Sequence, residues 1–213
     1  MDDVRPEVPW SDLAVNTAGQ GVAAEALAAK AKHPVRVMLG RVLGVHTDER
    51  AWRVGAKGEQ LVGRQLATLG TPWKVVHSIP IGQSGTDIDY LAIGPTGIYC
   101  INAKHHPGKR VWVAKDVFMV NGHRQPYIHA SRREASRVSK ILTKQTGHHI
   151  QSVGVIVVVR ANDLTVKEAS GDVYVIGRRE LVRWLRRRPD TLSDSEVQAI
   201  FESARQSTTW TSK

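Results

Sequence analysis

A hairpin signal in the middle of the chain restricts the fold more than any other feature. Residues 87–93 alternate between polar and apolar side chains, a Gly-Pro-Thr-Gly turn follows at 94–97, and residues 98–101 form an apolar run. A turn of this length between two such runs is typical of antiparallel strands. We therefore expect the two segments to pair, with alternate side chains of each strand directed to opposite faces of the sheet.

The segments around this hairpin predict helices and further strands. Residues 52–69 carry apolar residues at helical spacing and stop at Gly70, helical periodicity returns at 130–144, and 153–159 is a β-branched run typical of a strand buried on both faces. Further strands are expected at 74–80, 111–113, 118–120 and 173–176, and a helix at 179–187. We predict an α/β fold in which the two short strands at 111–113 and 118–120 extend the same sheet.

The chain of 213 residues is long enough for one well-buried core. We predict an N-terminal leader at 1–50, partly helical around its alanine-rich patch at 22–32 or disordered, and a domain at 51–188. The remaining 189–213 should hold a C-terminal helix that begins at the capping box Ser193–Glu196. Beyond Arg205 the tail is polar, and we expect it to be mobile.

Charge and composition narrow the partners and the compartment. The formal net charge of +10 favours a polyanionic partner. A single cysteine, Cys100, cannot form an intrachain disulfide, so the cytoplasm is the simplest location. The sequence has no apolar stretch of membrane-spanning length, and its acidic start lacks the order of a signal peptide, so we expect no membrane association.

Polar side chains gather at one edge of the predicted hairpin. Asp87 and Asp89 share one strand face, and Asn102 and Lys104 share a face at the end of the partner strand. Magnesium and similar hard cations prefer such oxygen ligands, and a nearby lysine can orient water or stabilise negative charge on phosphorus. Each residue also has an ordinary interpretation: Asp87 could cap a turn and Lys104 could be solvated.

Glu59 adds a third carboxylate, on the helix predicted at 52–69. Its position on the helical wheel is close to that of Val62 and Leu66, on the side expected to face the sheet. A buried carboxylate needs a cation, a metal or hydrogen-bond donors, whereas a glutamate at the rim of the apolar face would be exposed. Helical periodicity alone leaves both arrangements open.

In this order, these residues resemble the signature of the NERD family, the nuclease-related domains of the PD-(D/E)XK superfamily. The matching segments are Gly55-Ala56-Lys57-Gly58-Glu59, the run from Gly85 to Tyr99 with its Asp-x-Asp and Gly-Pro-x-Gly, and Ile101-Asn102-Ala103-Lys104. The resemblance covers about residues 52–185. It implies a restriction-endonuclease-like fold, a mixed β-sheet flanked by helices, and phosphodiester cleavage that depends on Mg²⁺ or Mn²⁺.

The resemblance also implies roles for individual residues. Glu59, Asp87, Asp89 and Lys104 become the catalytic set, in which Asp89, Asp87 and Glu59 bind the metal ion together with Asn102. We expect Glu59, Asp89 and Lys104 to converge in space. Asn102 departs from the pattern because the family usually has Asp or Glu at this position, and an amide offers an oxygen without charge.

Two main interpretations follow from this departure. The first is a metal-dependent nuclease acting on DNA in DNA processing or defence. The second is a catalytically silent nucleic-acid-binding module with a degenerate nuclease site. A third, an interaction domain that reuses the fold, would need the basic residues to bind an acidic protein.

Two basic segments are candidates for contact with phosphates. One follows Lys104 directly and contains His105, Lys109 and Arg110. The other is a helical stripe at spacings of four, three and four residues, made of Arg133, Arg137, Lys140 and Lys144. A solvated helix face is the alternative for the stripe. The adjacent histidine pairs do not favour zinc, because neighbours in a strand point to opposite faces.

Overall fold

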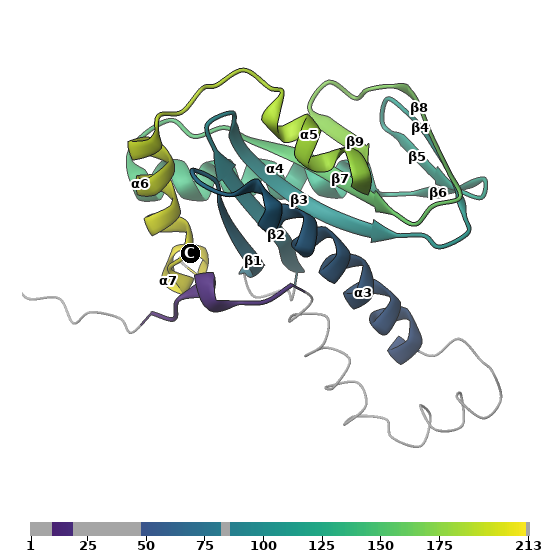
Figure 1. Cartoon of the computed structure of the whole chain (residues 1–213), viewed down its shortest axis with the longest axis horizontal. Coiled ribbons are helices and arrows are strands. Elements are labelled where there is room, and N and C mark those ends of the chain that lie inside the picture. The colour runs from purple at the N-terminus through teal and green to yellow at the C-terminus, as the bar shows by residue number, and fades with distance from the viewer. Residues whose placement is uncertain (1–9, 19–47, 82–85, 212–213) are drawn as a thin grey trace, which may run out of the picture.

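The structure is a computed structural model that describes residues 10–18, 48–81 and 86–211. Its described elements, in chain order, are η1 (Leu13–Val15), α3 (Asp48–Leu66), η2 (Ala67–Leu69), β1 (Lys74–Ile81), β2 (Thr86–Gly94), β3 (Gly97–His105), β4 (Arg110–Ala114), β5 (Val117–Val120), β6 (His123–Gln125), α4 (Tyr127–Thr146), β7 (Ser152–Val159), β8 (Asp163–Glu168), β9 (Val173–Gly177), η3 (Arg178–Glu180), α5 (Leu181–Arg186), α6 (Asp194–Ala204) and α7 (Ser207–Thr211) (Figure 1). None of the helices described is both long and apolar enough to cross a membrane.

The main sheet is mixed, with strand order β1-β2-β3-β7-β9. Strands β1, β2 and β3 are antiparallel, whereas β3, β7 and β9 run parallel. The predicted hairpin is confirmed: β2 and β3 pair from Gly94↔Gly97 to Tyr90↔Ile101. The parallel strand β7 reaches its place through α4, as a crossover between parallel strands requires.

Helices cover both faces of this sheet (Figure 1). On one, called here the α4 face, Leu91, Ile93 and Cys100 pack in a cluster with side chains of α4 and α6. On the opposite α3 face, Tyr90 and Ile101 pack in a second cluster with side chains of α3 and α5. This architecture confirms the expected α/β class and is consistent with a restriction-endonuclease-like fold.

The short strands predicted at 111–113 and 118–120 are present as β4 and β5, but the expectation that they extend the main sheet is wrong. They form a second sheet of order β6-β5-β4-β8, in which β4 and β8 are parallel. The chain leaves β3 through a turn at Gly108, whose φ of +69° suits glycine. Val111 and Phe118 then pack with Ile156 of β7. Alternation identifies the apolar side of a strand but does not choose its neighbour.

Both ends of the described chain pack on the core. The mobile tail expected beyond Arg205 is wrong for α7, because Trp210 is buried and its indole Nε1 donates to the Ala204 carbonyl at 2.9 Å. In the predicted leader, Leu13 is buried and the Asp12 carboxylate pairs with the Arg205 guanidinium. The alanine-rich patch at 22–32 lies outside the described residues.

Candidate active site

Strands β2 and β3 stop pairing where the polar residues begin. Their last register pair is Tyr90↔Ile101, after which β2 continues beside β1 and β3 continues beside β7. In the gap, Asp89 Oδ2 accepts a hydrogen bond from the backbone N–H of Ala103 at 2.7 Å. The Asp89 carboxylate thus binds a backbone donor of β3 beyond the last β2–β3 register pair.

Four of the predicted residues come together on the α4 face. Asn102 and Lys104 both contact side chains of α4. The pKa of Asp89 responds to the charges of Lys104 and Asp87, so these groups lie close to its carboxylate. The sequence prediction that Asp87, Asp89, Asn102 and Lys104 gather at one edge of the hairpin agrees with this placement.

The Asp89 carboxyl group is in an electrostatically costly position. Its pKa is raised to about 6. Burial is the largest cause, and the carboxylates of Glu134 and Asp87 act in the same direction, against the opposing effects of Lys104 and the Ala103 N–H. Burial also raises the pKa of Asp87. Several acids therefore share a space with too little positive charge, and a bound divalent cation would stabilise their ionised forms.

Asn102 contacts an acid that the sequence analysis did not assign to the site. Its side chain is 5% exposed, and its Nδ2 donates to Oε2 of Glu134 on α4 at 2.6 Å. Burial raises the pKa of Glu134, while the hydrogen bond from Asn102 and the charges of Lys104 and Arg133 lower it. Glu134 therefore turns inward from the basic stripe in which it lies in sequence.

An aromatic group holds the lysine. The Lys104 Nζ lies 5.1 Å from the ring centroid of Tyr127, a cation–π arrangement at the start of α4. The Tyr127 ring stacks on His106 at 5.9 Å and meets the edge of Phe118 at 5.1 Å between ring centroids. Burial and the nearby Lys104 charge lower the pKa of His106, so this histidine is neutral at pH 7.

Glu59 is buried, as one of the two sequence interpretations required, with 6% of its surface exposed. However, α3 packs on the face of the sheet opposite to α4. The Tyr90 hydroxyl lies on the α3 face as well: it donates to the Glu59 backbone carbonyl, and burial raises its pKa, with smaller effects in the same direction from the Asp89 and Glu59 carboxylates. The convergence of Glu59 with Asp89 and Lys104, and its role as a metal ligand, stay predictions.

The candidate phosphate-binding residues differ in accessibility. Lys109, Arg110 and the four members of the α4 stripe, Arg133, Arg137, Lys140 and Lys144, are exposed, as phosphate contact requires. His105 instead packs on α3, where its Nδ1 lies 2.6 Å from the Val54 carbonyl oxygen. Its side chain follows the strand alternation that turns Lys104 the other way. Binding of nucleic acid by any of these residues stays a prediction.

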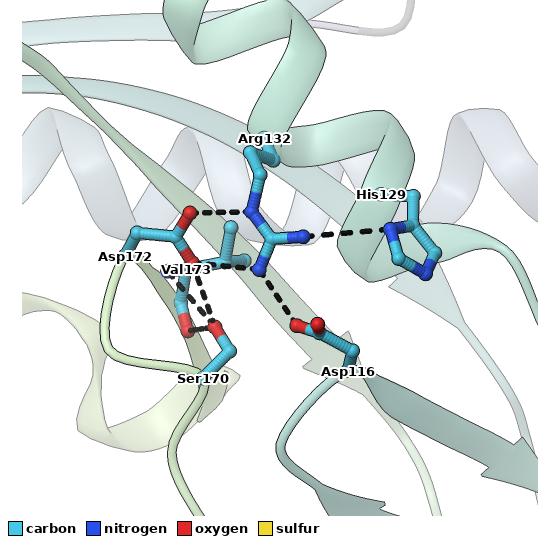
Figure 2. A network of polar contacts seen from close by, with 6 residues as sticks. All are labelled: Asp116, His129, Arg132, Ser170, Asp172 and Val173. Carbon is cyan, nitrogen blue, oxygen red and sulfur yellow. Dashed lines mark hydrogen bonds and ion pairs between the residues drawn. The ribbon is translucent and has the colours of Figure 1, made fainter.

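A second polar cluster anchors α4 to the turns beside it (Figure 2). The Arg132 guanidinium makes two hydrogen bonds to Asp172, and its Nη2 donates to Asp116 at 2.6 Å. Asp116 belongs to the turn between β4 and β5, and Asp172 to the turn between β8 and β9. One arginine therefore links the helix, the second sheet and the main sheet.

A cavity of about 800 Å³ lies away from the carboxylates, between α4 and the starts of β3 and β7. Arg132, Lys140, His149 and Arg188 line it, and Asp172 is the acid in its wall. The motif's turn and the start of β3 contribute to its wall, but the candidate site residues Glu59, Asp87, Asp89, Asn102 and Lys104 do not. The carboxylate and lysine cluster is therefore the better candidate for chemistry.

The donor set at the strand ends fits a hard divalent cation. Asp89, Asp87 and Glu134 offer carboxylate oxygens and Asn102 an amide oxygen, the ligand types that Mg²⁺ and Mn²⁺ prefer. Within the ranges 10–18, 48–81 and 86–211, no three acidic, histidine or cysteine side chains already form a metal-binding group. The fit therefore rests on donor chemistry and on the raised pKa values of Asp89 and Glu134.

The fold and this cluster define a restriction-endonuclease-like α/β domain with an acidic site and a lysine. The profile of the nuclease-related domain family, NERD, matches residues 54–159. The chain carries this domain and through it belongs to the NERD family. No curated protein and no solved structure matches the chain.

Two site residues escaped the sequence analysis. Glu134 lies next to Arg133 within the basic stripe, and Tyr127 lies outside the motif. The available signal for Glu134 was its mismatch with that stripe. Only the packing of α4 on the sheet, which brings Glu134 into contact with Asn102, assigns this acid to the site.

Proposed function

We propose that this chain is a metal-dependent phosphodiesterase that cleaves DNA. The observation that carries the proposal is the cluster at the separated ends of β2 and β3, where Asp89 lies close to Lys104 and to further acids. Membership of a nuclease-related family supports the same chemistry. DNA processing or defence is the proposed setting, with the cytoplasm as the expected location.

Each residue in the cluster has a chemical task. Asp89 and Asp87 would hold Mg²⁺ or Mn²⁺ with the Asn102 amide oxygen. When bound, the ion would polarise a phosphate oxygen and lower the pKa of a water molecule. Lys104 would orient the attacking water or stabilise the negative charge that develops on the phosphate. The Tyr127 ring supports this by limiting the positions of the amine.

Exposed cations provide a path for the DNA backbone. Lys109 and Arg110 follow the β3 end that carries Lys104, and the α4 stripe starts close to Glu134. Lysine and arginine contacts to phosphates read no bases, so we expect salt-sensitive binding with little sequence preference.

A catalytically silent binding module is the second candidate. Asn102 favours it, because a neutral amide stands where the family usually has an acid, and the amide nitrogen already donates to Glu134. The cationic surface would persist in such a module and would bind nucleic acid without metal.

Cleavage assays separate the two candidates. The protein is incubated with linear, nicked and single-stranded DNA in Mg²⁺, in Mn²⁺ and in EDTA. We expect cleavage that EDTA stops and that Asp89→Ala reduces on the order of a thousandfold, as for loss of a central electrostatic group. Asp172→Ala is the matched control because it removes the same charge from the Arg132 cluster, and it should retain activity. DNA binding without cleavage in any metal would favour the silent module.

A further inference from the structure

We infer that Glu134 supplies the metal-binding carboxylate that this chain lacks at position 102. The acid has in effect moved from strand β3 to helix α4, and Asn102 holds it in place. The inference rests on the proposed nuclease function and concerns which residue completes its site. It also removes the main reason to regard Asn102 as a sign of a degenerate site.

The hydrogen bond has the polarity that such an exchange requires. Asn102 donates through Nδ2 to Oε2 of Glu134 at 2.6 Å, so this bond does not use the amide oxygen of Asn102 or Oε1 of Glu134. An acid at position 102 would place two negative charges at this separation. With an amide on the strand and an acid on the helix, the pair has the single negative charge that a strand acid and a helix amide would have.

Glu134 also lies within the electrostatic range of the rest of the cluster. Its charge acts on Asp89, and the charge of Lys104 acts on Glu134. The adjacent Arg133 acts on Glu134 in the same direction as Lys104. The Glu134 carboxylate therefore belongs to the same charge cluster as the proposed central ligand.

The backbone of the fold brings α4 near enough for this contact. A Cβ atom added at Gly154 of β7 would lie 2.8 Å from the Ser131 Oγ and 3.2 Å from the Ser131 carbonyl oxygen. Only a residue without a side chain allows the helix to pack so closely on the strand. Glu134 follows Ser131 by about one helical turn, and it is thereby held over the strand that pairs with β7, where Asn102 lies.

A set of isosteric variants tests the inference. Mn²⁺ binding to the protein without DNA is measured by titration calorimetry and electron paramagnetic resonance, and cleavage is measured in parallel. Glu134→Gln keeps a hydrogen-bond acceptor for Asn102 and removes the charge, so a merely structural bond would survive it. We expect Mn²⁺ affinity to fall at least about tenfold, with cleavage falling in step. Glu168→Gln, which removes a surface acid paired with Lys115, is the control and should leave both unchanged.

The decisive variant exchanges the two groups. In the double substitution Asn102→Asp with Glu134→Gln, acid and amide change places while the total charge is kept. We expect Mn²⁺ affinity and cleavage to return to within about threefold of the starting protein, well inside the tenfold loss that a missing ligand causes. Melting temperatures of all variants confirm that each is folded.

The outcomes distinguish this inference from the proposed function. Wild-type protein that binds Mn²⁺ and cleaves DNA, with a folded Glu134→Gln variant that does both equally well, would overturn the role of Glu134 alone. Wild-type protein that neither binds Mn²⁺ nor cleaves DNA would overturn both. Glu134→Asp, which keeps the charge on a shorter side chain, should lose less affinity than Glu134→Gln, and the reverse order would also count against the inference.

Discussion

Helix α4 contacts two clusters of acidic side chains, and the two have opposite charge balance. In the Arg132 cluster, the guanidinium binds both Asp172 and Asp116, and its hydrogen bonds lower the pKa of Asp172 (Figure 2). In the site cluster, burial and neighbouring acids raise the pKa of Asp89 to about 6 and burial raises that of Glu134. Both clusters join the helix to a strand or turn. Only in the Arg132 cluster are the carboxylates held in ion pairs by a hydrogen-bonded cation, so we call it the satisfied cluster and the site the unsatisfied cluster.

The difference separates a structural role from a functional one. A salt bridge that neutralises its acids holds elements together and gains nothing from a further cation. Partly buried acids with too few positive partners lower the stability of the folded protein unless they take up protons or a metal ion. Acids of the same helix neighbourhood are therefore expected to respond differently to pH, to metal and to substitution.

The largest difference expected between these two parts of α4 concerns DNA binding, and it contrasts Arg132 with the stripe on the outer side of the helix. Reversing the charges of Arg133, Arg137 and Lys140 together should weaken binding by about two orders of magnitude and reduce the salt slope by roughly one per residue. Arg132→Ala should change affinity little, because that charge is already bound to Asp172 and Asp116. Fluorescence anisotropy between about 50 and 200 mM salt measures both. Equal losses of DNA affinity in the two variants would show that the stripe binds DNA no more strongly than Arg132 does.

Asp89→Asn should stabilise the metal-free protein at high pH. Because the pKa of Asp89 is about 6 in the folded protein and near 3.8 in the unfolded chain, folding is favoured by protonation, and stability is lost as pH rises through this interval. The ionised group then costs up to about 3 kcal/mol at pH 8. The substitution should raise the melting temperature at pH 8 in EDTA and have no effect at pH 3.

Magnesium provides the control for this prediction. It should raise the melting temperature of the wild type and leave that of Asp89→Asn unchanged, since a ligand stabilises only the state that binds it. A lower melting temperature for Asp89→Asn at pH 8 would show that the carboxylate is satisfied as in the Arg132 cluster.

Asn102→Asp alone should sharpen the comparison by adding an acid to the unsatisfied cluster. In a nuclease, Mg²⁺ and Mn²⁺ affinity should rise, by about tenfold, and cleavage should need less metal. In a silent binding module the same change should only weaken DNA binding, because it adds negative charge near the phosphates. Metal titrations of the wild type and the variant, with Asp89→Ala as the inactive reference, show whether metal affinity rises.

The smallest expected effect is on the stability of the satisfied cluster. Arg132→Ala should lower the free energy of unfolding by only about 1 kcal/mol, since the arginine and both aspartates are partly exposed and screened by solvent. The corresponding loss in melting temperature is about 2 to 4 °C for a chain of this size. Thermal unfolding measures it, and a loss several times larger would mean that the link between the two sheets is worth more than its ion pairs.

The sequence by itself determined the local geometry of the site. Strand alternation placed Asp87 with Asp89, and Asn102 with Lys104, because side-chain direction in a strand repeats every two residues. The Gly-Pro-Thr-Gly turn then set the antiparallel pairing of β2 and β3. The capping box at Ser193 is another local signal, confirmed by both of its hydrogen bonds. The order of these motifs was also enough to indicate the family.

Only the tertiary structure decided which elements meet. The contact between Asn102 and Glu134 spans 32 residues and depends on how closely α4 packs on β7 at Gly154. The burial of Trp210 in the C-terminal helix is likewise a matter of packing. Periodicity specifies which side of a helix or strand is apolar, whereas the partner of that side depends on all the elements competing for the same core. For this reason the sequence could place Asn102 beside Lys104 but could not show which acid lies against it.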